Sequence, residues 1–468
     1  MDLYEHLQAY AEQGKIPMHM PGHKRNASFF MKNPYEWDVT EVEGTDNLYH
    51  PQEILRQEME RLCVHYGTKD SYPLVNGSTG GILAAIASCC RRGDRILVAR
   101  NCHQSVYHAM FILELTPVYL YPREDRQTGI LLDIVPEQVA EALEREAVSC
   151  VILTSPTYEG VVSDIGAIAD ICHKKDIPLI VDEAHGAHFA WGQQFPETAM
   201  QQGADLVIES LHKTLPSLTQ TALLHRTTDR ISGEVLIRYL TMFQTSSPSY
   251  VLMAGISQCV SWLEAQGDGV WSDYDKRLGE FEEQAAAWHH LQLWRGKGQE
   301  RSKLVIGTWK TALTGVQLAE RMRSDYGIET EMAAPQYVLA MTSVADTGEN
   351  LQYLAKALSQ IDTTLNAVRY CSEESGKALS VSPGMPQAVV RMNAYEAFYQ
   401  AQESLPVEES LGRIAAEYAS VYPPGIPFLV PGEEITAEVI KVFHRTREYG
   451  LTLSGIADDT GCCIRVCQ

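Results

Sequence analysis

The sequence predicts an α/β protein whose central sheet is mostly parallel. Two observations lead to this prediction. Five short runs, RILVA, PVYLY, CVILT, PLIVD and DLVIE, are apolar throughout, and helical patterns separate several of them. Strands that are apolar on both faces are buried on both sides, and helices that connect parallel strands provide that cover.

Each element follows from its local pattern. The five apolar runs, at 95–99, 117–121, 150–154, 178–182 and 205–209, have the length and the branched side chains of strands. Segments 136–147 (PEQVAEALEREA) and 164–176 (DIGAIADICHKKD) repeat apolar residues at helical spacing. In such a sheet, ligands bind at the carboxyl ends of the strands.

The rest of the chain indicates further domains. KLVIGT and QYVLAMTSV, with helical stretches between them, predict a smaller α/β domain, and the part after MPQAVV ends in a helical run, EEITAEVIKVFHRTREYG. The predicted organisation is an N-terminal arm (1–50), a large domain (51–288), a small α/β domain (289–368) and a C-terminal domain (369–468).

Composition limits the possible functions. The 468 residues are 45% apolar and can bury a large core over more than one domain. A formal charge of -22 argues against nucleic acid or an anionic membrane as a partner. The N-terminal sequence lacks a signal-peptide pattern and no apolar run approaches membrane-spanning length, so we expect a cytoplasmic protein. The 11 cysteines form no Cys-x-x-Cys pair, so we expect reduced thiols and no metal site.

Polar residues follow two of the predicted strands. Asp182 ends PLIVD, and the stretch from Ser210 to Lys213 follows DLVIE. Earlier, Asn76 to Gly81 (NGSTGG) precede a helical run, and free N–H groups at a helix start can hold a phosphate. Taken alone, this stretch fits an ordinary helix cap better.

Together these groups indicate pyridoxal phosphate. A phosphate cradle, a carboxylate for the pyridinium nitrogen and a lysine for a Schiff base are the three anchors that this cofactor needs. Lys213 alone fits an exposed turn charge, and Asp182 alone fits a turn cap. Only their combination favours the cofactor.

The same motifs resemble those of a known family. The order Gly-Ser-Thr, RNCHQSVYHA, VDEAHGAH and ESLHKTLPSLTQ is similar to the Orn/Lys/Arg decarboxylases of the aspartate-aminotransferase fold (fold type I), especially their short bacterial form. PMHMPGHKR at 17–25 and VYPPGIPFLVPGEEIT at 421–436 extend the resemblance over nearly the whole chain.

The resemblance implies an activity. It implies pyridoxal-phosphate-dependent decarboxylation of a basic amino acid, arginine or lysine first and then ornithine, to the amine and CO2. It also implies a homodimer or higher homo-oligomer with shared active sites. Polyamine biosynthesis and acid response both remain open as its purpose. The alternatives are another reaction on this cofactor, such as aminotransfer, or a catalytically silent homologue.

The resemblance also implies residue roles. Lys213 corresponds to the Schiff-base lysine, Asp182 to the partner of the pyridine nitrogen and His103 to the histidine that stacks on the ring. His185 corresponds to a position near the ring hydroxyl. The residues that would hold the phosphate are Ser78, Thr79, Ser210 and His212.

Substrate contacts are implied at four positions. Thr157 and Tyr158 match a segment near the substrate, although an aromatic residue there also fits simple packing. Glu433 resembles a carboxylate that meets the distal cation of the substrate, and a surface loop residue is the alternative. Asp46, like the PGHK segment at 21–24, lies in a stretch similar to those that approach an active site across a dimer interface.

Overall fold

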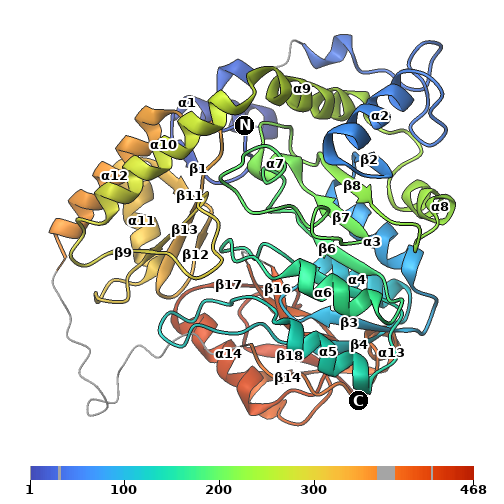
Figure 1. Ribbon diagram of the computed structural model, residues 1–468. Coiled ribbons are helices and arrows are strands. Elements are labelled where there is room, and N and C mark those ends of the chain that lie inside the picture. Colours follow the sequence, from blue (N-terminus) through green and yellow to red (C-terminus); the bar gives the residue numbers. More distant parts are fainter. Residues whose placement is uncertain (1, 30–32, 366–384, 423–424) are drawn as a thin grey trace.

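A seven-stranded sheet forms the centre of the molecule (Figure 1). The computed structural model describes residues 2–29, 33–365, 385–422 and 425–468. The sheet order is β2 (Asp70–Leu74), β8 (Ala222–Arg226), β7 (Leu206–Glu209), β6 (Leu179–Asp182), β5 (Val151–Thr154), β3 (Arg95–Ala99) and β4 (Thr116–Leu120). Only β8 runs antiparallel to its neighbours. The predicted mostly parallel sheet is therefore confirmed.

Helices cover both faces of this sheet. One side carries α3 (Gly77–Cys89) and α4 (Gln104–Ile112), and the other carries α5 (Pro136–Arg145) and α6 (Ile165–His173) (Figure 1). The five strands expected from the apolar runs correspond to β3 to β7, within one residue at each end. The sequence patterns did not identify β2 or β8.

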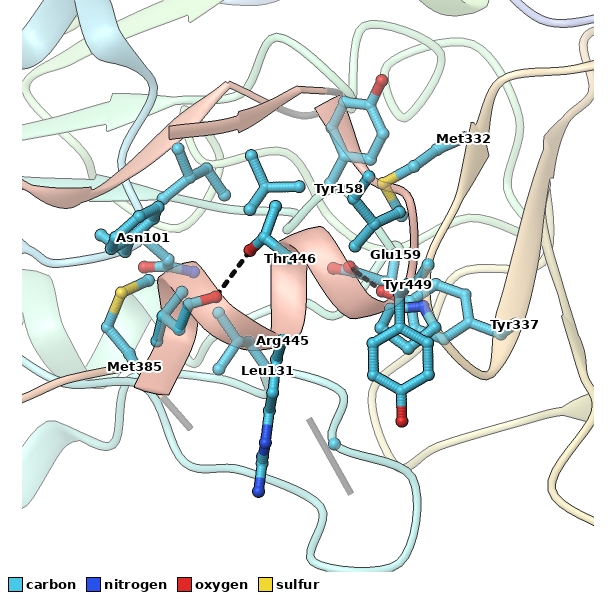
Figure 2. Close-up of a pocket in the computed structure, with 18 of the residues that line it drawn as sticks. Asn101, Leu131, Tyr158, Glu159, Met332, Tyr337, Met385, Arg445, Thr446 and Tyr449 are labelled. Atoms are coloured by element: carbon cyan, nitrogen blue, oxygen red, sulfur yellow. Dashed lines mark hydrogen bonds between the residues drawn. The ribbon is translucent and has the colours of Figure 1, made fainter. Parts of the chain in front are cut away.

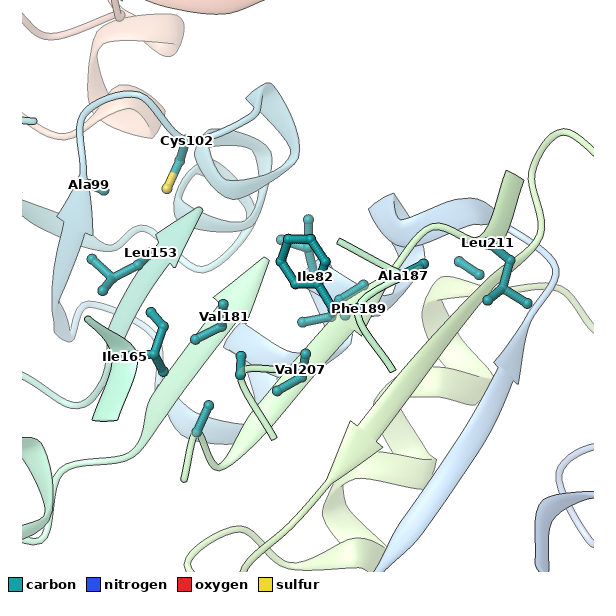
Figure 3. Packing of buried hydrophobic residues seen from close by; sticks show 14 of the residues in the cluster. Ile82, Ala99, Cys102, Leu153, Ile165, Val181, Ala187, Phe189, Val207 and Leu211 are labelled. Atoms are coloured by element: carbon teal, nitrogen blue, oxygen red, sulfur yellow. The ribbon is translucent and has the colours of Figure 1, made fainter. Parts of the chain in front are cut away.

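The core between these layers is apolar. Figure 3 shows Leu153, Val181 and Val207 of three neighbouring strands packed near Ile82 of α3. Gly81 allows α3 to lie this close, because a Cβ there would come within 2.6 Å of Leu74 Cδ1. This tight packing fixes the positions of the carboxyl ends of these strands.

The remaining large-domain helices pack around this core. The short helix α7 (Leu211–Thr214) directly follows β7. The other helices are α2 (Ile54–Tyr66), α8 (Gly233–Phe243), α9 (Tyr250–Gln266) and α10 (Asp268–Ala285).

A second, antiparallel sheet has the order β12 (Met332–Ala333), β13 (Tyr337–Met341), β10 (Lys303–Gly307) and β9 (Gln292–Trp294). Its helices are α11 (Gly315–Tyr326) and α12 (Gly348–Thr363). The N-terminal segment, with α1 (Leu3–Glu12), joins this part because β1 (Ile16–Met18) pairs in parallel with β11 (Ile328–Thr330). Short 3-10 helices follow at Ala27–Phe29 and Pro34–Glu36.

The C-terminal part holds two further sheets beside α4 (Figure 1). They are β14 (Gln402–Pro406) with β18 (Cys463–Cys467), and β16 (Ile426–Leu429) with β15 (Ala419–Tyr422) and β17 (Thr452–Ser454). The helices are α13 (Ala394–Tyr399), α14 (Ala437–Glu448) and the 3-10 turn Val407–Glu409. The predicted boundary at 368/369 lies outside the described residues, and the domain limits stay predictions.

Candidate active site

Asp182 and Lys213 lie at the carboxyl ends of neighbouring parallel strands. Asp182 is the last residue of β6, pairs in register with Ile208 of β7, and is buried. Ser210 follows β7 and precedes α7, which carries Lys213. Burial raises the pKa of the Asp182 carboxyl, while Lys213 and the N–H of Ala184 act against that rise. The structure thus brings together the two residues that the strand pattern predicted to converge.

The amino group of Lys213 contacts a histidine. Its Nζ lies 3.1 Å from Nε2 of His185, which is buried and follows Asp182 by three residues. Desolvation lowers the pKa of Lys213, against the attraction of Asp182. A lowered pKa makes the neutral, nucleophilic amine accessible nearer to neutral pH.

His103 caps α4 at the same edge of the sheet. Its Nδ1 accepts the N–H of Ser105 at 3.2 Å and lies 2.8 Å from Ser105 Oγ, which fixes the ring. Burial first, and then the charge of Lys213, lowers the pKa of His103 to about 3. The ring is therefore neutral at physiological pH.

The predicted phosphate residues come from two helix starts. Ser78 and Thr79 lie in the first turn of α3, where Gly77 adopts φ +68°. The hydroxyls of Ser210 and Thr214 are buried and have no hydrogen-bond partner among the residues that the structure describes. His212 differs, because its Nδ1 donates to the Thr221 carbonyl at 2.9 Å and burial lowers its pKa to about 4. As a neutral ring, it has only an acceptor left for a ligand.

The N-terminal PGHK segment (21–24) contacts α7, the helix that carries Lys213, within the same chain. The N–H of Gly22 donates to the carbonyl of His212 at 2.7 Å. A Cβ on Gly22 would lie 2.5 Å from the carbonyl oxygen of Leu215. Lys24 is buried and donates to the carbonyls of His19 and Met341. A contact across a dimer interface for this segment stays a prediction.

Of the predicted substrate residues, Tyr158 lies nearest to this site. Its ring meets His185 edge-on at a centroid distance of 4.8 Å, and its hydroxyl donates to Glu331. Thr157 is buried, and its Oγ1 accepts the N–H of Val161 at 3.2 Å. Both residues line a cavity of about 200 Å³ between the large, small and C-terminal parts (Figure 2). Tyr337 donates to Glu159 in its wall at 2.8 Å.

Glu433 and Asp46 are engaged in structural contacts. Glu433 is buried and lies 3.1 Å from the guanidinium of Arg100. Asp46 accepts the backbone N–H groups of Asn47, Gln52, Glu53 and Leu55, which lower its pKa to about 2. Within this chain, both carboxylates are engaged by these protein partners. Their contacts with a substrate stay predictions.

Lys303 belongs to the site but was missed in the sequence. It starts β10, is fully buried, and its Nζ lies 3.1 Å from Nδ1 of His185. The one signal in the sequence that could have pointed to Lys303 is a lysine at the start of an apolar strand. Its partner is 118 positions away in the chain, so no local pattern links the two.

Comparison with known proteins decides the family. The model of the Orn/Lys/Arg decarboxylase major domain matches residues 1–298, and that of the C-terminal domain of the same decarboxylases matches residues 377–464. The chain belongs to the Orn/Lys/Arg decarboxylase family. This decarboxylase is 31% identical over 481 residues to the arginine decarboxylase of Halalkalibacterium halodurans, covering 99% of this chain and 97% of the relative.

Solved structures support the same fold. The lysine decarboxylase LdcF of Francisella novicida has a TM-score of 0.78 at 18% identity, over 94% of this chain and 76% of that chain. The ureidoglycine-glyoxylate aminotransferase of Bacillus subtilis has a TM-score of 0.59 at 15% identity, over 78% of this chain and 96% of that one. The decarboxylase therefore has the predicted fold of type I transferases. No helix in its described part is long and apolar enough to cross a membrane.

Proposed function

We propose that this enzyme is a pyridoxal-phosphate-dependent decarboxylase that converts arginine to its amine and CO2. The observation that carries the proposal is the placement of Lys213 and Asp182 on neighbouring strand ends. A relative named arginine decarboxylase, similar over nearly the whole chain, favours arginine over lysine and ornithine.

The residues present fit this cofactor. The buried hydroxyls of Ser210 and Thr214 have no partner within the described chain and suit phosphate oxygens. The first turn of α3, with Ser78 and Thr79, offers backbone N–H groups for the same phosphate. Desolvation of Lys213 favours its neutral amine, which is the form that bonds to the aldehyde of pyridoxal phosphate.

The side chains around the ring have separate tasks in this proposal. Bound pyridoxal phosphate supplies an electron sink for the pair left at Cα when CO2 departs. Asp182 holds a proton at the ring nitrogen and so keeps that sink strong. His103 is neutral and lies at the same strand edge, where it can stack on the ring without adding charge. His185 lies beside the lysine amine.

We further propose a cytoplasmic homodimer. Apolar side chains of the N-terminal region, including Leu3, Tyr4 and Val42, are exposed in the single chain, as expected if a second subunit covers them. The ten cysteines in the described residues are free thiols, which suits a reducing compartment. Light scattering of the purified protein tests the dimer directly.

The decisive experiment is a parallel assay of CO2 and amine formation from arginine, lysine and ornithine. We expect release from arginine by purified protein loaded with cofactor. A yellow protein that forms a keto acid but no CO2 would support aminotransfer instead. A colourless protein that takes up no cofactor would support a silent homologue.

A further inference from the structure

Glu183 and Glu209 lie side by side on neighbouring strands of the large sheet. Glu183 follows Asp182 at the end of β6, and its N–H donates to the carbonyl of Ile208 at 2.9 Å, which continues the register of β6 with β7. Glu209 is the last residue of β7. Side chains alternate along a strand, so both glutamates turn to the face opposite to Asp182. Their carboxyl groups lie near enough to interact directly.

Both carboxyl groups are removed from water, and most of their oxygens lack a donor. Glu183 is 2% exposed and Glu209 is 0% exposed. Oε1 of Glu183 accepts the N–H of Ala199 at 2.9 Å. Oε2 of Glu183 and both oxygens of Glu209 have no hydrogen-bond partner in the part of the chain that the structure describes. Two ionised carboxylates are therefore strongly disfavoured in these surroundings.

No positive charge balances the pair. Among the described residues, no lysine or arginine forms an ion pair with either carboxyl, and the basic group in reach is Nε2 of His225, 3.7 Å from Oε2 of Glu209. This distance is too long for a charge-assisted hydrogen bond. Nδ1 of His225 lies 2.8 Å from Oγ of Ser71, and burial lowers the pKa of His225 to about 3, so its ring is neutral.

The other titratable groups that face the pair bring no positive charge either. They are Asp182 on β6 and Tyr66 on α2, with Cys259 of α9 behind Tyr66. Burial raises the pKa of the Tyr66 hydroxyl and of the Cys259 thiol, so both groups are neutral. The charge of Asp182 disfavours a further negative charge on Glu183. These surroundings favour a protonated carboxyl within the pair.

We propose that Glu183 and Glu209 bind one proton between them, and that the resulting carboxyl pair positions Asp182 and His185. One carboxyl is the acid and donates its O–H to the other, which is a carboxylate. The shared proton turns repulsion between two like groups into a hydrogen bond. The positioning role rests on the proposed function, because it concerns the cofactor, whereas the shared proton does not depend on it.

Glu183 connects the pair to the site through the backbone. It stands between Asp182 and His185 in the chain, and its bond to the N–H of Ala199 ties together the two ends of the loop that contains His185. Gly186 packs against it, since a Cβ there would lie 2.7 Å from Glu183 Cγ. Without the proton, two buried anions would lie side by side and displace Glu183, and with it the strand end that carries Asp182.

The pair makes the site sensitive to rising pH. Burial raises the pKa of each carboxyl well above the ordinary 4.5, and the neighbouring Glu209 raises that of Glu183 further. Because the folded-state pKa is raised, the stabilisation by the proton is fully present below pH 4.5 and is lost as the pH rises through the folded value.

Infrared spectroscopy of the cofactor-free, full-length protein tests the shared proton. A protonated carboxyl group gives a C=O stretching band that an ionised carboxylate lacks. Near neutral pH we expect one such band from the pair, lost in Glu183→Gln and in Glu209→Gln, because the amide then donates to the remaining carboxylate. Glu60→Gln is the control, since Glu60 is exposed on α2. If either substitution within the pair leaves the spectrum unchanged, the proposal is overturned.

Cofactor release tests the positioning role. In protein loaded with pyridoxal phosphate, the pH at which half of the cofactor is released should rise by about one unit in Glu209→Gln, because the amide keeps the bond to Glu183 without a titrating proton. Glu209→Leu keeps the size but not the bond, and it should release cofactor more readily at every pH. The same pH of release in Glu209→Gln and Glu60→Gln would overturn the positioning role.

A measurement on the unsubstituted protein covers the case in which the glutamine variants do not fold. ¹³C labelling of glutamate side chains shifts the bands of glutamic acid away from those of aspartic acid. Absence of any protonated glutamic acid near neutral pH would overturn the proposal. The infrared readouts need no cofactor, so failure of the proposed function alone appears as a protein that takes up no pyridoxal phosphate but keeps the band.

Discussion

The guanidinium of Arg100 lies 3.1 Å from the carboxylate of Glu433, and both side chains are buried. Arg100 follows β3 of the large sheet, whereas Glu433 lies in the C-terminal part. Arg100 also donates to the carbonyl of Pro427 and lies over the ring of Tyr119. The pair therefore joins the C-terminal part to the part that holds the large sheet.

Breaking this pair should destabilise the protein. Removing one partner of a buried ion pair leaves an unpaired charge and costs about 3–5 kcal/mol. We expect Arg100→Met to lower the thermal midpoint clearly, measured by circular dichroism. Glu60→Gln removes one partner of an exposed ion pair and should leave the midpoint nearly unchanged. If Glu433 instead meets the substrate, Glu433→Gln should raise KM for arginine without lowering the midpoint.

Lys213→Ala should abolish turnover and the visible absorbance of the loaded enzyme. The substitution removes the amine that would bond to the cofactor aldehyde. Absorbance spectra and CO2 release measure the two effects on one sample, and a melting curve checks the fold. Retained turnover in this variant would rule out the proposed role of Lys213.

Asp182→Asn should lower kcat by about 100-fold or more, because a neutral amide stabilises a protonated ring nitrogen poorly. Cofactor content, measured after alkaline release, should fall less than kcat. Asp170→Asn, at an exposed position on α6, provides the matched control. Equal kcat in the two variants would argue against Asp182 as the partner of the ring nitrogen.

Gly22→Ala should weaken cofactor binding from outside the site. The new methyl group would lie 2.5 Å from the carbonyl oxygen of Leu215, so the backbone after Lys213 must shift. Titration with pyridoxal phosphate should show a higher Kd. Gly269→Ala, in a helix with open space around it, should bind normally and be slightly more stable. Equal affinity in both variants would show that the N-terminal segment does not support α7.

Asp362 should make stability depend on pH at acidic values. Its carboxylate accepts the N–H groups of His289, His290 and Leu291 at 2.7–2.8 Å, and these bonds lower its pKa below the ordinary 3.8. The folded-state pKa is depressed, so the stabilisation is present above pH 3.8 and is lost as pH falls through the lower folded value.

Asp362→Asn should therefore lower stability by about 2 kcal/mol at neutral pH. Denaturant midpoints of variant and unsubstituted protein should converge as the pH falls below 3.8. Asp273→Asn, on the exposed side of α10, serves as the control. A difference that stays constant across this range would mean that the charge of Asp362 is not involved.

The sequence predicted the parts of the site that lie on consecutive strands. Parallel strands have their carboxyl ends at one edge, so Asp182 and Lys213 could be brought together from the strand pattern alone. The phosphate residues Ser78 and Ser210 followed from the same reasoning and the family resemblance. Their roles toward a cofactor stay predictions.

The rest depends on packing between distant segments. Lys303 reaches His185 only because the small sheet docks on the large domain. Likewise, no local pattern reveals that Glu433 pairs with Arg100, since 333 positions separate them. The antiparallel strand β8 was missed because its run, ALLHR, carries polar residues at one end.

The pairing of β1 with β11 has a consequence for biosynthesis. Residues 16–18 leave the ribosome early, but their partners at 328–330 are made only after most of the chain. Gly22 lies just beyond β1, so this pairing cannot hold it against α7 before residues 328–330 have been made. Contacts of such long sequence separation form late in folding. A nascent chain can thus complete its large sheet well before it becomes competent to take up a cofactor.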